Sequence, residues 1–202
     1  NQKIIFSNDP GVFSYDIERM LRDNEILTPP FVHFPQPNEI ELPGKGIYLL
    51  MTGIDGVRES GMYDAVGELG MQLYSPKFSI ASLPESIRQK AIPLAPADMN
   101  NPNIVSQYAR AGWSSVWISH LSEKGFITPR YNKKDDPEML FNEMGIERLG
   151  LGAIIDLDAK SALEKSLELA GRVGSFNSGL VRKYETLDGI KYAAKKVVDY
   201  MQ

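Results

Sequence analysis

The segment GIYLLMTG, residues 46–53, is the feature that most constrains how this chain can fold. It is apolar without interruption from Ile47 to Met51, whereas a strand with one solvated face alternates apolar and polar residues. Such a run is typical of a strand that is buried on both faces, as in a parallel sheet covered by helices. The rest of the chain must therefore supply further strands and the helices that cross over between them.

Other segments are predicted to alternate as strands and helices around this one. Strands are predicted over KIIFS (3–7), FVHF (31–34), KFSIASLP (77–84) and SSVWISHL (114–121), and helices over SYDIERMLRDN (14–24), GMYDAVGELGMQL (61–73) and IVSQYARAG (104–112). This alternation predicts a doubly wound α/β fold with a mostly parallel sheet of the Rossmann or flavodoxin type. Such sheets bind ligands at the carboxyl ends of their strands, where we expect the polar loops SNDPG, TGIDGVRES and LPES.

The pattern of residues changes after PRYN, residues 129–132. The charged run KKDD favours a solvated linker, and Arg130 is predicted either to fix the chain against the site or to pair with the acids of DDPE. From Glu138 onward the pattern is helical, with one apolar face formed by Leu163, Leu167 and Ala170 and another by Ile190, Ala194, Val197 and Met201. We therefore predict an α/β domain over residues 1–134 and a helical appendage over residues 135–202.

Composition excludes several functional classes. The 22 basic and 26 acidic residues give a net charge of −4, which argues against nucleic acid as a partner. There is no cysteine, and the two histidines, His33 and His120, cannot form a histidine-rich centre, so no metal site is expected. No apolar run is long enough to span a membrane and the N-terminus lacks a signal-peptide pattern, so we expect a cytoplasmic protein without a membrane partner.

Three segments, in order, resemble the nucleoside 2-deoxyribosyltransferases. KIIFSNDPGVFS is similar to that family's first strand and its glycine–aromatic loop. ELGMQLYSPKFSIASLPES resembles its active-site helix with the following strand, and ISHLSEKGFITPRYN resembles the end of its fold. The resemblance covers about residues 3–132. It implies a homo-oligomeric enzyme that cleaves the N-glycosidic bond of a (deoxy)nucleoside or nucleotide, as a transferase or hydrolase, without a cofactor.

The resemblance implies that Glu68 is the nucleophile. A carboxylate stabilises the positive charge that develops at the anomeric carbon and captures it as a covalent intermediate. Gly67 and Gly70 flank this region and leave room for a sugar to approach the helix. Either Asp64, which shares a helix face with Glu68, or Glu59 is expected to act as the acid or to hold a sugar hydroxyl.

The candidate substrate-binding residues lie in the loops beside these elements: Asn8, Asp9, Gly11, Phe13, Gly53, Asp55, Gly61 and Asn103. By resemblance, Asn103, or alternatively Asn100 or Asn101, completes the site of a neighbouring subunit. For the NDPG segment, which contains Asp9 and Gly11, the sequence favours a simple turn over a binding loop.

Two other functions remain open at this point. The segment PNEIELPG is shorter than its counterpart in the family, which supports a catalytically inactive nucleotide-binding or structural module whose C-terminal helices assemble with a larger complex. A hydrolase that destroys a nucleotide signal or NAD would share the nucleophile and differ in its ligand.

Overall fold

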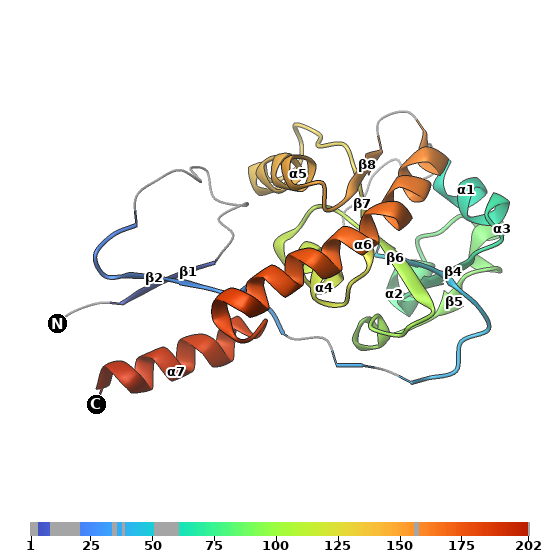
Figure 1. The fold of residues 1–202 in the computed structure, drawn as a ribbon. Helices are drawn as coiled ribbons and strands as arrows, with labels where there is room; N and C mark the ends of the chain where they lie inside the picture. Colours follow the sequence, from blue (N-terminus) through green and yellow to red (C-terminus); the bar gives the residue numbers. More distant parts are fainter. Residues whose placement is uncertain are drawn as a thin grey trace.

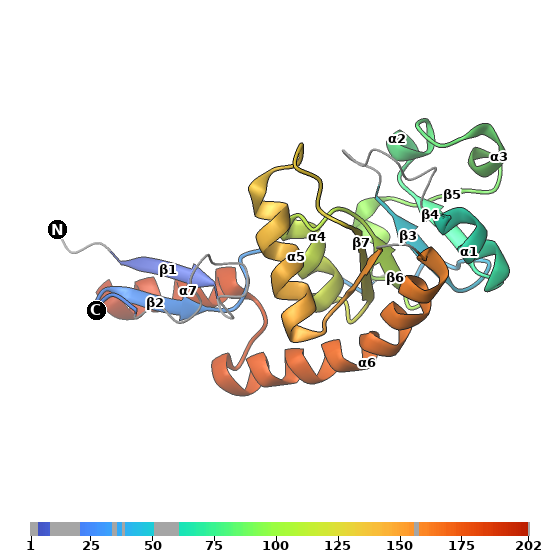
Figure 2. The same ribbon diagram turned by 90° about the horizontal axis from the view of Figure 1, so that it is seen from above.

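The computed structural model describes residues 4–8, 21–33, 36–37, 39–50, 61–155 and 158–201. At its centre is a six-stranded parallel sheet in the order β5-β4-β3-β6-β7-β8 (Figures 1 and 2). Its strands are β3 (Gly46–Leu49), β4 (Gln72–Ser75), β5 (Ile92–Pro93), β6 (Ile104–Tyr108), β7 (Gly125–Pro129) and β8 (Ala153–Ile155). From β3 the chain moves outward to β5, returns to β6 beside β3, and moves outward the other way. This is the strand order of a Rossmann fold, and it confirms the predicted fold class.

Helices cover both faces of the sheet. They are α1 (Met62–Glu68), α2 (Lys77–Ile80), α3 (Glu85–Arg88), α4 (Trp113–Leu121), α5 (Pro137–Leu149), α6 (Ala159–Tyr184) and α7 (Gly189–Met201), with a 3-10 turn η3 at Pro96–Asp98. On one face α1 and α6 pack against Ile47 and Ile127, and on the other face α4 and α5 pack against Phe126. Phe126 and Ile127 are adjacent in β7 and both fully buried, as expected for a strand covered on both sides. No helix in the described ranges is long and apolar enough to span a membrane.

A second, smaller sheet lies at the N-terminus. Strands β1 (Ile5–Asn8) and β2 (Glu25–Thr28) pair in parallel, and α7 lies beside them, away from the main sheet (Figures 1 and 2). The beginning of α7 is tightly packed, because a Cβ at Gly189 would lie 2.1 Å from the carbonyl oxygen of Pro29. The predicted strand KIIFS is thus confirmed, while FVHF is not a strand at its described residues 31–33.

Three predicted elements have the wrong secondary structure. KFSIASLP forms α2 and a turn, because the strand is the preceding QLYS; IVSQYARAG contains strand β6; and SSVWISHL lies within helix α4. The buried polar residues Ser106 and Gln107 give β6 an amphipathic pattern in sequence, whereas α4 is buried enough to look like a continuous apolar strand. Short apolar runs of this kind do not distinguish buried strands from buried helices.

Residues 135–202 form helices as predicted, and they also complete the sheet. β8 lies between α5 and α6 in the sequence and pairs with β7, with Ile127 opposite Ala153. Helix α6 then crosses the sheet face over β8, β7 and β6. The segment predicted to be a purely helical appendage is therefore part of the α/β core at its beginning.

We expect Gly125→Ala to destabilise the fold by about 1–3 kcal/mol, the usual range for overpacking a core. A Cβ at this position would lie 2.6 Å from the backbone oxygen of Ser166 in α6, so the helix would have to move away from the sheet. Gly171→Ala is the matched control. Gly171 lies in α6, like Ser166, and a Cβ there would meet nothing within 4 Å. That variant should gain about 1 kcal/mol from helix propensity. Urea unfolding measures both, and equal effects would contradict the packing argument.

The buried His120 predicts a loss of stability in mild acid. Burial lowers its pKa from 6.5 to about 4. The unfolded chain therefore binds a proton between pH 6.5 and 4 that the folded chain does not, so the stabilisation present above pH 6.5 is lost as the pH falls through this window. In His120→Leu, the free energy of unfolding should depend less steeply on pH over this window than it does in the wild type. His33→Gln, which changes the exposed second histidine, should keep the wild-type slope.

Candidate functional site

The strand order reverses at the carboxyl ends of β3 and β6. These two strands are neighbours, with Leu49 opposite Tyr108, but the connections that follow them lead to opposite sides of the sheet. The backbone N–H of Leu50 donates to the carbonyl of Tyr108 at 2.9 Å, so the two strands stay paired up to this edge. Doubly wound sheets hold their ligands at such a reversal of strand order.

A short turn leads from β6 into helix α4 at this edge. The N–H of Gly112 donates to the carbonyl of Arg110 at 2.7 Å, and α4 begins at Trp113 without a side-chain cap from Gly112. Instead the N–H of Trp113 donates to Oε1 of Glu138, in α5, at 3.1 Å. The first N–H groups of a helix have no partners within the helix and attract anions. The carboxylate of Glu138 thus occupies the position in which an anionic ligand would be bound.

Asn142 holds this carboxylate in place. Its side-chain amide, fully buried, donates to the carbonyl of Ala111 at 2.6 Å and to Oε1 of Glu138 at 3.1 Å. Its Oδ1 is also buried and has no hydrogen-bond partner among the described residues. Buried polar atoms without partners are uncommon in folded proteins and call for an explanation such as a bound water or ligand.

Arg110 contributes the positive charge of this edge. Its Nη2 lies 2.6 Å from Oδ1 of Asp135, and both side chains are 27% exposed. The backbone N–H of Asn132 donates to the other oxygen of Asp135 at 3.2 Å, which fixes the carboxylate. The Nε of Arg110 is buried and has no partner among the described residues. The guanidinium is therefore held in one orientation and still has a donor that is not used.

The acidic run DDPE organises this edge and is not simply a solvated linker. Asp135 binds Arg110, Asp136 caps α5 by accepting the N–H of Glu138 at 2.9 Å, and Glu138 binds the start of α4. Pro137, at the first position of α5, fits this N-terminal cap.

Arg130 pairs with acids, but not with those of DDPE. Its Nη1 lies 2.6 Å from Glu143 and 3.2 Å from Glu147, both in α5. The side chain of Glu143 is only 4% exposed and also accepts the N–H of Tyr131. This pair fixes the chain that leaves β7 against α5.

Glu68 and Asp64 lie on helix α1, which covers the sheet face opposite to α4 and α5. Helix α1 returns from the carboxyl end of β3 to the amino end of β4, so Glu68, at its last position, lies away from the carboxyl edge of the sheet. Its carboxylate is 58% exposed and forms a 2.8 Å ion pair with Lys160, a contact that raises the pKa of Lys160. Asp64 is exposed one turn earlier, as predicted, and both acids line a hollow of about 670 Å³ with Lys90. The role of Glu68 as a nucleophile stays a prediction.

The other predicted residues are dispersed over the molecule. Asn103 lies before β6 at the amino edge, where its side chain donates to the carbonyl of Leu42 at 3.4 Å. Asn8 accepts the N–H of Phe31 at 2.9 Å beside the small sheet. Gly61, with φ of 68°, precedes α1 at the carboxyl edge of the main sheet. Outside the described residues lie Glu59, Asp9, Gly11, Phe13, Gly53 and Asp55.

Arg110, Glu138 and Asn142 were not predicted as site residues, although the sequence contains a signal for them. In IVSQYARAGW a strand is followed by a glycine-containing turn and then by the first residue of a helix. This is the local order of a nucleotide-binding βα unit. The sequence pattern predicts a helix over IVSQY, which places the turn at the wrong position in the chain. Within the described ranges no group of three or more histidine, aspartate or glutamate residues is arranged to hold a metal ion.

The comparisons with known proteins support the fold. No protein-family model and no curated protein matches the sequence. The structure is similar to that of the glycotransferase of kitacinnamycin, with a TM-score of 0.62, 15% identity, and coverage of 94% of this chain and 52% of that one. It is also similar to the glycosyltransferase SnogD from Streptomyces nogalater, with a TM-score of 0.51, 12% identity, and coverage of 85% of this chain and 52% of that one. The chain thus spans about half the length of these structures and shares their α/β fold; the resemblance to deoxyribosyltransferases is supported only at the level of the fold.

Proposed function

We propose that this chain forms the nucleotide-binding half of a glycosyltransferase, with a nucleoside diphosphate sugar bound at the carboxyl ends of β3 and β6. The observation that carries the proposal is the start of α4 at the reversal of strand order, next to Arg110, whose buried Nε has no partner among the described residues. The two similar structures, both glycosyltransferases, support the same reaction class.

The diphosphate would bind to the first turn of α4. A phosphate oxygen would replace the carboxylate of Glu138 on the N–H of Trp113, where the helix dipole favours negative charge. The guanidinium of Arg110 comes from the turn immediately before this helix and presents planar donors that suit phosphate. Its unused Nε is available to a ligand without breaking the pair with Asp135.

Glu138 would then bind the ribose. A carboxylate accepts hydrogen bonds at two oxygens, and two neighbouring hydroxyls supply the donors in matching geometry. Asn142 anchors the same region of α5 to the turn before α4, so Glu138 stays near the ligand after it leaves the helix. Glu138, which accepts the N–H of Trp113 in this structure, would therefore bind the sugar of the nucleotide once a phosphate has taken its place.

Glycosyl transfer breaks the bond between the anomeric carbon and the diphosphate oxygen. The acceptor oxygen attacks that carbon and loses its proton to a base, and the bonding electrons pass to the leaving diphosphate. Arg110 and the start of α4 stabilise this negative charge as it develops. We propose that the acceptor and the base lie in a second half, which would correspond to the part of the similar structures that this chain does not match.

Arg110→Gln should weaken the binding of a nucleoside diphosphate about tenfold or more, because a charge-assisted hydrogen bond contributes about 1.5–3 kcal/mol. Calorimetric titration of the chain with UDP, TDP and GDP measures this effect. Arg148→Gln, which changes an exposed arginine in the last turn of α5, is the matched control and should bind like the wild type. Failure of the wild type to bind any of these nucleotides, or an equal loss in the control, would contradict the proposal.

The alternative of N-glycoside cleavage by Glu68 makes a different prediction. We expect Glu68→Gln to leave nucleoside diphosphate binding unchanged, because Glu68 lies toward the opposite edge of the sheet. Chromatography of deoxynucleosides, their monophosphates and NAD, incubated with the wild type with and without a free acceptor base, tests the alternative directly. Free base or an exchanged nucleoside produced by the wild type but not by Glu68→Gln would favour the deoxyribosyltransferase-like reaction over the proposed one.

A further inference from the structure

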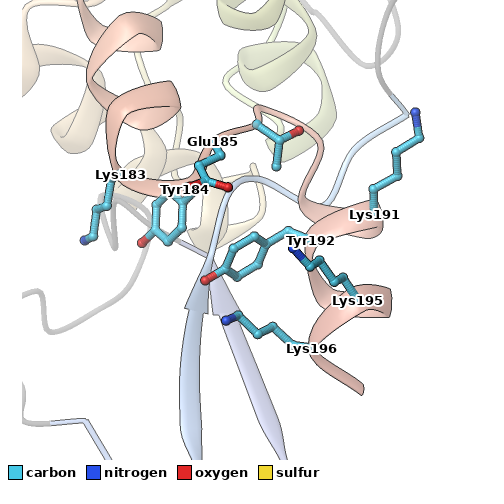
Figure 3. Close-up of a pocket in the computed structure, with 8 residues that line it drawn as sticks. Lys183, Tyr184, Glu185, Lys191, Tyr192, Lys195 and Lys196 are labelled. Atoms are coloured by element: carbon cyan, nitrogen blue, oxygen red, sulfur yellow. The ribbon is translucent and has the colours of Figure 1, made fainter. Parts of the chain in front are cut away.

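A second polar cleft lies between the end of α6 and the beginning of α7. It has a volume of about 480 Å³ and is lined by four lysines, two tyrosines, Glu185 and Thr186 (Figure 3). Asn177 of α6 already contacts the end of α4, and this cleft lies at least six residues farther along α6. It is therefore remote from the proposed nucleotide site, and its function does not depend on that proposal.

Two tyrosine rings form the rigid wall of the cleft. Tyr184 is buried, and its ring packs edge-on against that of Tyr192, with centroids 5.3 Å apart and an interplanar angle of 80°. Glu185 ends α6 in the left-handed conformation, which turns the chain so that α7 brings Tyr192 back to Tyr184. The wall is thus built from both helices and from the turn between them.

The same rings position two ammonium groups. Nζ of Lys183 lies 5.1 Å from the centroid of Tyr184, and Nζ of Lys196 lies 5.3 Å from that of Tyr192. Cation–π contacts of this length favour a defined position over free solvation. Figure 3 shows the ammonium group of Lys183 beside Tyr184 and that of Lys196 beside Tyr192, with the two phenolic oxygens between them.

The lining of the cleft carries more positive than negative charge. Lys191 points away and lies 3.7 Å from Asp188, but neither Lys195 nor Lys196 forms an ion pair with a described residue. Lys183 complements the dipole at the end of α6, whereas Lys195 and Lys196 precede the last turn of α7. The lining contains four lysines and one acid, Glu185, in a chain whose net charge is −4.

We propose that this cleft binds a phosphate group, held by the ammonium groups of Lys183 and Lys196 and by the hydroxyl of Tyr192. A phosphate dianion offers acceptors in several directions and neutralises two of the clustered charges. The hydroxyl of Tyr192 forms no hydrogen bond with a described residue and is therefore able to donate to it. Glu185 is the one carboxylate of the lining and favours a ligand that is bound on the lysine side.

Pyrophosphate titration by calorimetry tests the site, with Arg110→Gln as the background so that binding at α4 contributes less. We expect the double variant Lys183→Gln/Lys196→Gln to weaken pyrophosphate binding at least tenfold, and Tyr192→Phe to weaken it less. Lys165→Gln, an exposed lysine on α6, is the matched control and should leave binding unchanged. Circular dichroism of each variant verifies that the helices are intact.

A parallel assay distinguishes the sources of the phosphate. Co-sedimentation with phosphatidic acid vesicles, compared with phosphatidylcholine vesicles, uses the same variants. Lysine-dependent binding of pyrophosphate supports a site for a soluble phosphate, and lysine-dependent binding of phosphatidic acid vesicles alone supports a site for a lipid headgroup. If the starting protein binds neither probe, or if Lys165→Gln reduces binding as much as the double variant, the proposal is overturned.

Discussion

The close approach of α6 to the sheet is the contact on which the arrangement of the molecule depends. Gly125 allows the backbone of Ser166 to lie against β7, and the hydroxyls of Ser106 and Ser166 are 3.0 Å apart in the buried interface. A helix of 26 residues is about 39 Å long, so this one element reaches from the ion pair with Glu68 at its beginning to the lysine cleft at its end. Its position relative to β6 and β7 therefore determines where both outlying features lie.

The parallel sheet could be predicted from sequence because the composition of its central strand is compatible with few other structures. A run such as GIYLL has to be buried on both faces, which requires parallel neighbours and covering helices. The long helices were also predictable, since the apolar faces of α6 and α7 repeat over several turns. Whether β6 and α4 are strand or helix could not be predicted in the same way, because both segments are short and buried. Their polar residues are buried as well: Ser106, Gln107, Ser119 and His120.

The candidate site was harder to predict than the fold, because it depends on contacts between distant residues. Arg110 and Asp135 are 25 positions apart, as are Trp113 and Glu138. In the sequence the acids of DDPE are only a charged run, and such runs are usually solvated. Their contacts follow from two facts of the fold: α4 starts at the edge where the strand order reverses, and α5 begins beside it with a cap. The acidic pair Asp64 and Glu68, by contrast, was recognisable in sequence, since helix spacing alone places the two residues on one face.

Under the proposed function, the contact between Glu138 and the start of α4 would link the stability of the protein to ligand binding at this edge. A carboxylate that satisfies the N–H of Trp113 stabilises the unliganded protein, and an anionic ligand must displace it before the same donor is available. The cost of this displacement falls if the released carboxylate gains new donors, as it would from sugar hydroxyls beside a phosphate. A free phosphate offers no such hydroxyls and would leave Glu138 next to a second negative charge. The arrangement therefore favours a ligand that joins a phosphate to a polyhydroxyl group, which is the chemical form of a nucleotide.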